Sequence, residues 1–164
     1  MRLVKRRVTF KTLGIDFRKY PERYRIAKGE QGVLSVEPYK AEILPYWKFR
    51  TPEIATQSVR DLMKLFRTYR KKKDFVGMDM TRKFLQMGYT RSRRYANHRS
   101  GHKYIGPVPR NLKGVSGAHG RAVAPREPDL LKAKSAEIFR SAWELVEKDR
   151  LYKAMRLAWK SRFG

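Results

Sequence analysis

Arginine and tyrosine alternate through residues 88–104 of the sequence. Guanidinium groups hold phosphates through paired hydrogen bonds, and both guanidinium planes and tyrosine rings stack on exposed bases. Polar side chains that read base edges in duplex DNA are few here, Asn97 being the main one. We therefore expect the stretch to bind folded RNA, which offers phosphates and unpaired bases on an irregular surface. The candidate residues are Tyr89, Arg91, Arg93, Arg94, Tyr95, Arg99, Lys103 and Tyr104.

Sequence patterns of enzymes and metal sites are missing. His98 and His102 stand four residues apart, but no thiol or carboxylate follows nearby to complete a metal site. No phosphate-binding loop, nucleophile elbow, zinc-protease motif or dinucleotide fingerprint occurs. Asp79 precedes Arg82 and Lys83 by three and four residues, which predicts an ion pair within one helix. We expect no catalytic residue, no metal and no cofactor.

A metal-dependent nucleic-acid-processing enzyme stays open as an alternative, because separated carboxylates can converge in a fold. The acids that would have to do so are Asp16, Glu22, Glu30, Glu37, Glu42 and Glu53.

The charge balance points to a polyanionic partner. The 164 residues hold 40 Lys and Arg against 15 Asp and Glu, a net charge of +25. Such an excess repels itself unless a polyanion neutralises it. The cations are spread through a chain with many aromatic residues, whereas a membrane-binding basic motif is a short cluster beside a lipid anchor. We therefore predict nucleic acid as the partner, with no membrane and no small-molecule substrate.

Cysteine is absent, which excludes disulfides, iron–sulfur clusters, thiol catalysis and cysteine-containing zinc sites. Separately, no apolar run approaches the roughly 20 residues that cross a bilayer.

Basic residues gather in three further places. No acid occurs between Asp79 and Glu127, and this stretch adds His102, Arg110, Lys113 and Arg121 to the candidates. Residues 1–13 contain Arg6 and Arg7 and no acid; we expect a basic arm that orders on a polyanion, an import signal being the alternative. The run Lys71, Lys72 and Lys73 exceeds what one helix end can use, so it is a candidate contact too.

Helical periodicity dominates from residue 51 onward. Thr51 and Pro52 predict a helix start, and Ala55, Val59, Leu62, Met63, Phe66 and Tyr69 form its buried stripe. Asp74 predicts the cap of a second helix that stops at Gly88, with a third beginning at Thr90.

Asp129 and Asp149 predict the caps of two closing helices. The buried side of the first is expected to hold Leu131, Ile138, Phe139, Ala142, Leu145 and Val146. Residues 33–36 are the best strand candidate, and residues 29–32 have the spacing of an RNA-binding GxxG loop but are better read as a plain turn.

These elements predict a mainly α fold: a small helical domain with one or two short strands, a basic N-terminal arm and a long irregular loop. Residues 1–13 form the arm, 14–98 the helical core with its short strand, 99–128 the Gly/Pro-rich basic loop, and 129–164 the C-terminal helices that pack on the core. Glycine and proline recur through the loop, so it forms no core of its own.

Five motifs stand out along the chain: YRIAKGEQGVL at 24–34, EPYK at 37–40, EILP at 42–45, FVGMDM at 75–80 and RKFLQMGYTRSRRYANH at 82–98. They resemble a family of small uncharacterised proteins of bacteria, viruses and eukaryotes, known only as a domain of unknown function. The resemblance covers residues 15–104 and, more loosely, the helices from Leu131. It implies no activity and no catalytic residues.

Three basic segments have no counterpart in that resemblance: the arm, the run Lys71 to Lys73 and residues 106–126. Basic arms and loops added to a compact domain are typical of proteins recruited to ribosomes. The leading hypothesis is a structural, rRNA-binding subunit of a ribosome, mitochondrial rather than cytoplasmic, with ribosomal RNA and neighbouring ribosomal proteins as partners. A free DNA- or RNA-binding accessory or regulatory protein is the alternative.

Overall fold

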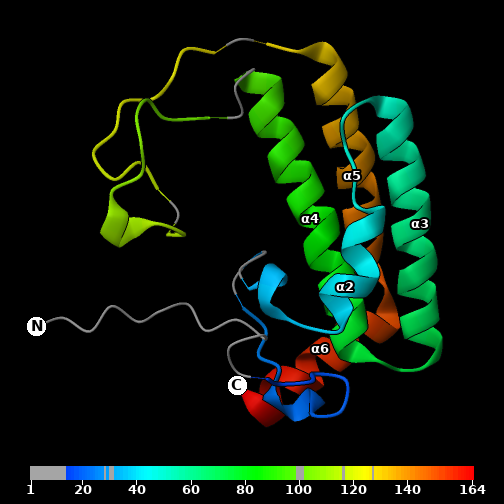
Figure 1. Ribbon diagram of the computed structural model, residues 1–164. Coiled ribbons are helices and arrows are strands. Elements are labelled where there is room, and N and C mark those ends of the chain that lie inside the picture. The colour runs from blue at the N-terminus through cyan, green and yellow to red at the C-terminus, as the bar shows by residue number, and fades with distance from the viewer. Residues whose placement is uncertain (1–13, 28, 30–31, 99–101, 116, 127) are drawn as a thin grey trace, which may run out of the picture.

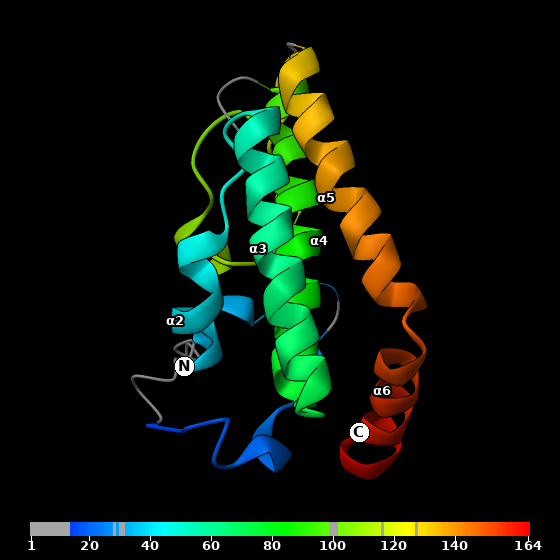
Figure 2. The same ribbon diagram turned by 90° about the vertical axis from the view of Figure 1, so that its right-hand side faces the viewer.

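Three long helices lie side by side in the structure, a computed structural model that describes residues 14–27, 29, 32–98, 102–115, 117–126 and 128–164. They are α3 (Pro52–Lys71), α4 (Phe75–Asn97) and α5 (Leu130–Lys148). α4 runs antiparallel to the other two and packs most extensively on α5 (Figure 1). The shorter α6 (Arg150–Phe163) follows α5 and lies at one end of the bundle (Figure 2). We call this the α6 end and the opposite end, where α4 stops and α5 starts, the loop end.

The N-terminal third covers one side of α4 with short turns. These are the 3-10 turns η1 (Pro21–Arg23), η2 (Val33–Ser35) and η3 (Leu44–Tyr46) and the short helix α2 (Tyr39–Ile43). Tyr24, Tyr39 and Ile43 are buried there and join the core that α3, α4 and α5 enclose. The mainly helical fold predicted from the sequence is confirmed.

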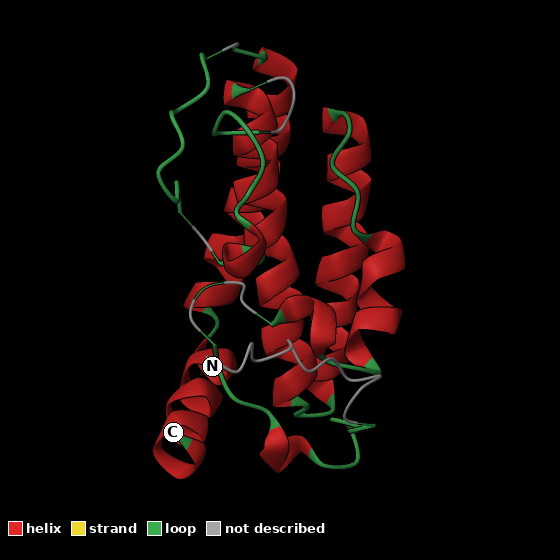
Figure 3. Ribbon diagram, turned by 60° about the vertical axis from the view of Figure 1, so that its left-hand side comes forward, coloured by secondary structure: helices red, strands yellow, loops and turns green. Residues whose placement is uncertain are grey.

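The strand predicted at residues 33–36 is wrong, since these residues make a 3-10 turn. Val33 and Val36 are both buried, three residues apart, which one helical turn achieves and an alternating strand does not. The hydroxyl of Ser35 donates to the carbonyl of Gly32 at 2.8 Å and closes the turn. Among the described residues there is no strand, only an isolated antiparallel bridge between Tyr104 and Val123 (Figure 3).

The four predicted helix caps are confirmed. In each, a side-chain oxygen accepts a hydrogen bond from a backbone N–H of the first turn; the capping residues are Thr51, Asp74, Asp129 and Asp149. The stripe predicted for α3 is confirmed as well: its members are either buried or partly buried against the core.

The predicted helix end at Gly88 and restart at Thr90 are wrong, because α4 runs unbroken to Asn97. Gly88 is buried against α5, where a Cβ atom would lie 2.2 Å from Cδ1 of Phe139. The glycine therefore lets α4 and α5 approach closely and does not terminate the helix.

Two leucines predicted to face the core from α5 lie outside it. Leu131 is 60% exposed and Leu145 is 63% exposed. Small residues take part in the buried side of α5 instead, because α4 approaches so closely; the buried residues are Ser135, Ala136, Phe139, Ala142 and Val146. Ile138 packs at the edge of the core.

Candidate nucleic-acid interface

The ion pairs of the described carboxylates lie outside residues 88–126. Arg18 pairs with Glu42 and Arg70 with Asp149, at 2.6 and 2.9 Å. The other pairs that the structure describes are Lys40–Glu37, Arg82–Asp79, Arg82–Glu147, Arg156–Glu147 and Arg140 with both Glu137 and Glu144. Within the described part of residues 88–126, no lysine or arginine has an ion-pair partner. This stretch therefore presents uncompensated positive charge.

The last turns of α4 carry the first part of this charge. Arg91 and Arg94 are exposed and Arg93 is partly buried, while Ser92 and Ala96 between them face the core. None of the three guanidinium groups makes a hydrogen bond or an ion pair within the described residues. A rigid helix, held by its buried side, thus presents free guanidinium donors to solvent.

His98 does not lie on that exposed face. It is only 6% exposed, and its Nδ1 lies 3.0 Å from the carbonyl of Pro125. The backbone N–H of Asp129 donates to the carbonyl of Ala96 at 2.7 Å, so the loop leaves and rejoins the bundle at nearly the same point. His98 anchors the base of the loop.

The loop itself has a short hydrogen-bonded stem, a feature that its composition did not predict. The N–H of Ile105 donates to the carbonyl of Ala122, and that of Ala124 donates to the carbonyl of Lys103, at 2.8 and 2.7 Å. Beyond the stem, the described residues between 106 and 121 lie to one side of α4, apart from its ribbon (Figure 1).

Arg121 holds the loop together. Its guanidinium group donates to the carbonyls of Ala118, Gly106 and Gly117 at 2.9 to 3.3 Å and lies 5.0 Å from the ring centroid of Tyr104. Arg121 and Tyr104, both predicted to contact RNA, therefore also stabilise the loop itself. The exposed cationic candidates of the loop are His102, Lys103, Arg110 and Lys113.

Tyr89 and the run Lys71 to Lys73 do not join this surface. Tyr89 packs against Trp143 of α5, with ring centroids 5.9 Å apart. Lys71, Lys72 and Lys73 are exposed at the α6 end, about 30 Å from Arg94 along α4 at 1.5 Å per residue. Arg6, Arg7 and Arg99 lie outside the described residues. The predicted contacts thus fall into two separate regions.

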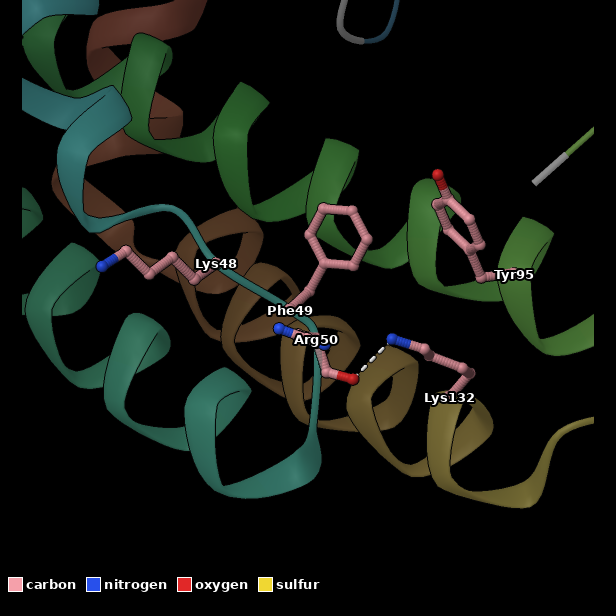
Figure 4. Close-up of a pocket in the computed structure, with 5 residues that line it drawn as sticks. All are labelled: Lys48, Phe49, Arg50, Tyr95 and Lys132. Carbon is pink, nitrogen blue, oxygen red and sulfur yellow. Dashed lines mark hydrogen bonds between the residues drawn. The ribbon is translucent and has the colours of Figure 1, made fainter. Parts of the chain in front are cut away.

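A pocket beside the α4 arginines contains residues that the sequence analysis missed. Its volume is about 360 Å³, and Lys48, Phe49, Arg50, Tyr95 and Lys132 line it (Figure 4). Lys132 of α5 reaches across to donate to the carbonyl of Arg50 at 2.5 Å. The alternation of aromatic and basic residues in WKFR at 47–50 was a usable signal, whereas nothing local to Lys132 pointed to this site.

A second polar cluster is fully buried at the α6 end. The carboxylate of Asp79 accepts hydrogen bonds from the hydroxyls of Tyr24 and Tyr152 and from the guanidinium of Arg82. Burial alone would raise the pKa of Asp79, but Arg82, Lys83 and the two hydroxyls outweigh it and hold that pKa below its ordinary value. Burial lowers the pKa of Lys83 to about 8.

The carboxylate of Asp79 is already occupied by its hydrogen-bond partners, so it is poorly placed to act as a catalytic acid or base. Arg82 also donates to the carbonyl of Gly29 at 2.6 Å, which ties the N-terminal segment to α4. The predicted ion pair between Asp79 and Arg82 is confirmed. Because the pair is buried and is bonded to α6 and to the N-terminal segment, it holds these two parts of the chain against α4. Among the described residues, no three acids or histidines gather as a metal site would require.

A comparison with protein-family models matches residues 8–162 to a domain of unknown function, DUF4385. The chain belongs to the DUF4385 family. No curated protein and no solved structure matches it.

Membership in DUF4385 extends over more of the chain than the motifs suggested. The matched span includes the loop at 106–126 and the lysine run, which were expected to lie outside the resemblance, and it includes part of the arm. The basic loop is therefore placed within the region that the DUF4385 model matches. Among the helices described in this DUF4385 chain, none is both long and apolar enough to cross a membrane.

Proposed function

We propose that this protein is a structural RNA-binding protein, a ribonucleoprotein component that neutralises phosphates at its loop end. More specifically, we propose a subunit of the mitochondrial ribosome, with ribosomal RNA and neighbouring ribosomal proteins as its partners. The observation that carries the proposal is the exposed cationic surface of α4 and the loop, whose described lysines and arginines have no carboxylate partner.

Physical chemistry favours a polyanion on that surface. The helix fixes the backbone of these arginines before binding, and the planar guanidinium group loses less rotamer entropy per hydrogen bond than a lysine does when a phosphate binds it bidentately. Each neutralised phosphate releases counterions, which makes the association favourable and dependent on salt. A stemmed loop that extends beside a helix suits an irregular RNA surface better than the regular groove of duplex DNA.

The proposal is tested by the salt dependence of binding to a structured RNA fragment. Replacing Arg91, Arg93 and Arg94 together by Gln should lower the slope of log affinity against log salt by about two to three and weaken binding at least about tenfold. These side chains make no hydrogen bond or ion pair within the described structure, so the fold should persist.

A matched control removes the same charge from the other end. Replacing Lys71, Lys72 and Lys73 by Gln should weaken binding of a short RNA hairpin much less than the α4 triple does. Equal losses would mean that net charge alone drives binding, and unchanged affinity of the α4 triple would remove this face as the contact.

The ribosomal part of the proposal has its own test. The native protein should co-sediment with a mitochondrial ribosomal subunit and dissociate as salt rises. A protein that stays at the top of a low-salt gradient contradicts the ribosomal assignment. Binding to naked duplex DNA as tight as to structured RNA would favour a free nucleic-acid-binding accessory protein instead.

A further inference from the structure

We propose that the pocket formed by Lys48, Phe49, Arg50, Tyr95 and Lys132 receives one unpaired nucleotide of the bound RNA. The base stacks on the aromatic wall, and its phosphate meets the surrounding cations. This inference rests on the proposed RNA-binding function and adds a preference for RNA with an unpaired base to it.

The segment at 47–50 is held in an extended form that separates its two kinds of side chain. Lys48 and Arg50 are exposed, whereas Trp47 and Phe49 are partly buried. The backbone N–H of Lys48 donates to the hydroxyl of Ser58, which itself donates to the carbonyl of Tyr46, at 3.0 and 2.6 Å. Ser58 is buried on α3, so the segment is fixed to the bundle before any ligand binds.

The aromatic wall is backed by the core. The ring of Phe49 lies 5.0 Å from that of Trp47, which lies 5.9 Å from the buried Phe84. On its other side, Phe49 meets Tyr95 of α4 with centroids 6.0 Å apart and planes tilted by 41°. This pair is too close to admit a base between its rings, so the base stacks on the outer surface of the pair. Such a surface can accept any base, because stacking needs only a π face.

Polar groups around the wall suit a nucleotide. Within the described residues, the hydroxyl of Tyr95 makes no hydrogen bond, so it is free to meet a base edge. The ammonium group of Lys132 uses one donor on the carbonyl of Arg50 and lies 5.8 Å from the Tyr95 ring centroid, which leaves two donors for a phosphate (Figure 4). No carboxylate lines the pocket.

Size and position agree with a single nucleotide. The site is a shallow depression of about 360 Å³ that is open to solvent, so one base can reach the rings while the rest of its nucleotide stays outside. The exposed Arg91 lies four residues before Tyr95 on the same face of α4, so an RNA backbone held by Arg91 has the pocket beside it. An unpaired base on that strand would need only to turn toward Tyr95, without extraction from a paired stem.

The test compares two RNA hairpins that differ only in one bulged 2-aminopurine. The protein should bind the bulged hairpin about tenfold more tightly than the fully paired one, and the fluorescence of the bulged base should change on binding. Tyr95→Leu or Phe49→Leu should abolish this preference and leave affinity for the paired hairpin unchanged. Tyr46→Leu is the matched control, because Tyr46 is exposed in the same segment but does not line the pocket.

Arg50→Gln provides a second variant whose folding is not at risk, because the side chain is exposed and Lys132 binds only its backbone carbonyl. It should lower the salt slope by about one for the bulged hairpin alone.

Each other outcome overturns a defined part of the reasoning. Equal affinity for both hairpins, or a preference that survives loss of the rings, overturns the pocket and leaves the RNA-binding proposal standing. Failure to bind either hairpin overturns both.

Discussion

Replacing Gly88 by Ala tests whether a glycine inside α4 sets the distance between α4 and α5. In an ordinary helix interior this change stabilises by about 1 kcal/mol, because alanine loses less backbone entropy on folding. Here the new Cβ would lie 2.2 Å from Cδ1 of Phe139, and ordinary contacts begin at 3.4 Å. The ring would have to move by about 1.2 Å, although it is fully buried.

The steric term should exceed the gain in helix propensity. Overpacking a closed core costs about 1 to 3 kcal/mol, and a clash with three ring carbons belongs at or above the upper end of that range. The expected net loss in the free energy of unfolding is about 2 kcal/mol, which lowers Tm by about 4 to 8 °C in a chain of this length. Urea unfolding and a thermal melt measure both quantities.

A double-mutant cycle with Phe139→Ala identifies the cause. That variant alone should lose about 3 to 5 kcal/mol through its cavity. In its background Gly88→Ala should stabilise by up to about 1 kcal/mol, since the methyl group fills part of the space. Ser141→Ala on the exposed side of α5 should stay within about 0.5 kcal/mol of the native protein. A Gly88→Ala protein that is more stable than the native one refutes the close-packing explanation.

Two further predictions concern the buried cluster. Asp79→Asn leaves Arg82 buried without its carboxylate and should cost about 3 to 5 kcal/mol at pH 7. Because the pKa of Asp79 is lowered in the fold, this stabilisation is complete above the ordinary carboxyl pKa and is lost as pH falls through the folded value; native and variant stabilities that keep their separation at about pH 2 would contradict it. Because burial lowers the pKa of Lys83 to about 8, unfolded chains hold a proton there that folded chains lack between pH 8 and 10. Native stability should therefore rise by about 2 kcal/mol over that window relative to Lys83→Met, as measured by urea unfolding, and parallel pH profiles would show that Lys83 is not the titrating group.

The sequence predicted the helices well because their signals are local. A capping side chain and the first turn it bonds lie within three residues, so Thr51, Asp74, Asp129 and Asp149 mark helix starts without knowledge of the fold. The meaning of Gly88 is not local: the residue that explains it, Phe139, is 51 positions away on another helix. The strand predicted from the valines at 33 and 36 was wrong for a related reason, because residues of high β propensity form a strand only where a partner strand is present.

The candidate interface, like the fold, was predicted only where its residues are close in sequence. The arginines of α4 were identified because they are close in sequence and a helix keeps them together. The pocket could be found only in part, because Tyr95, Lys132 and residues 48–50 come from three separate segments. Arg121 shows the reverse limit: its charge placed it among the ligand contacts, but three carbonyls of its own loop occupy its donors.

The positive surface is itself a consequence of where the fold uses its carboxylates. Asp74 and Asp149 cap helices at the α6 end and Asp79 lies in a buried joint there, so these acids cannot neutralise the loop end, while Asp129 at the loop end is bonded to the first turn of α5. Adding an acid to the exposed face of α4 would relieve the repulsion among Arg91, Arg93 and Arg94 at no cost in packing. A chain that instead keeps 47 consecutive residues free of acid there retains a repulsion that only an external polyanion removes. Stability of the free protein and affinity for RNA are thus opposed at this face, and a substitution such as Arg94→Glu should improve the first while it weakens the second.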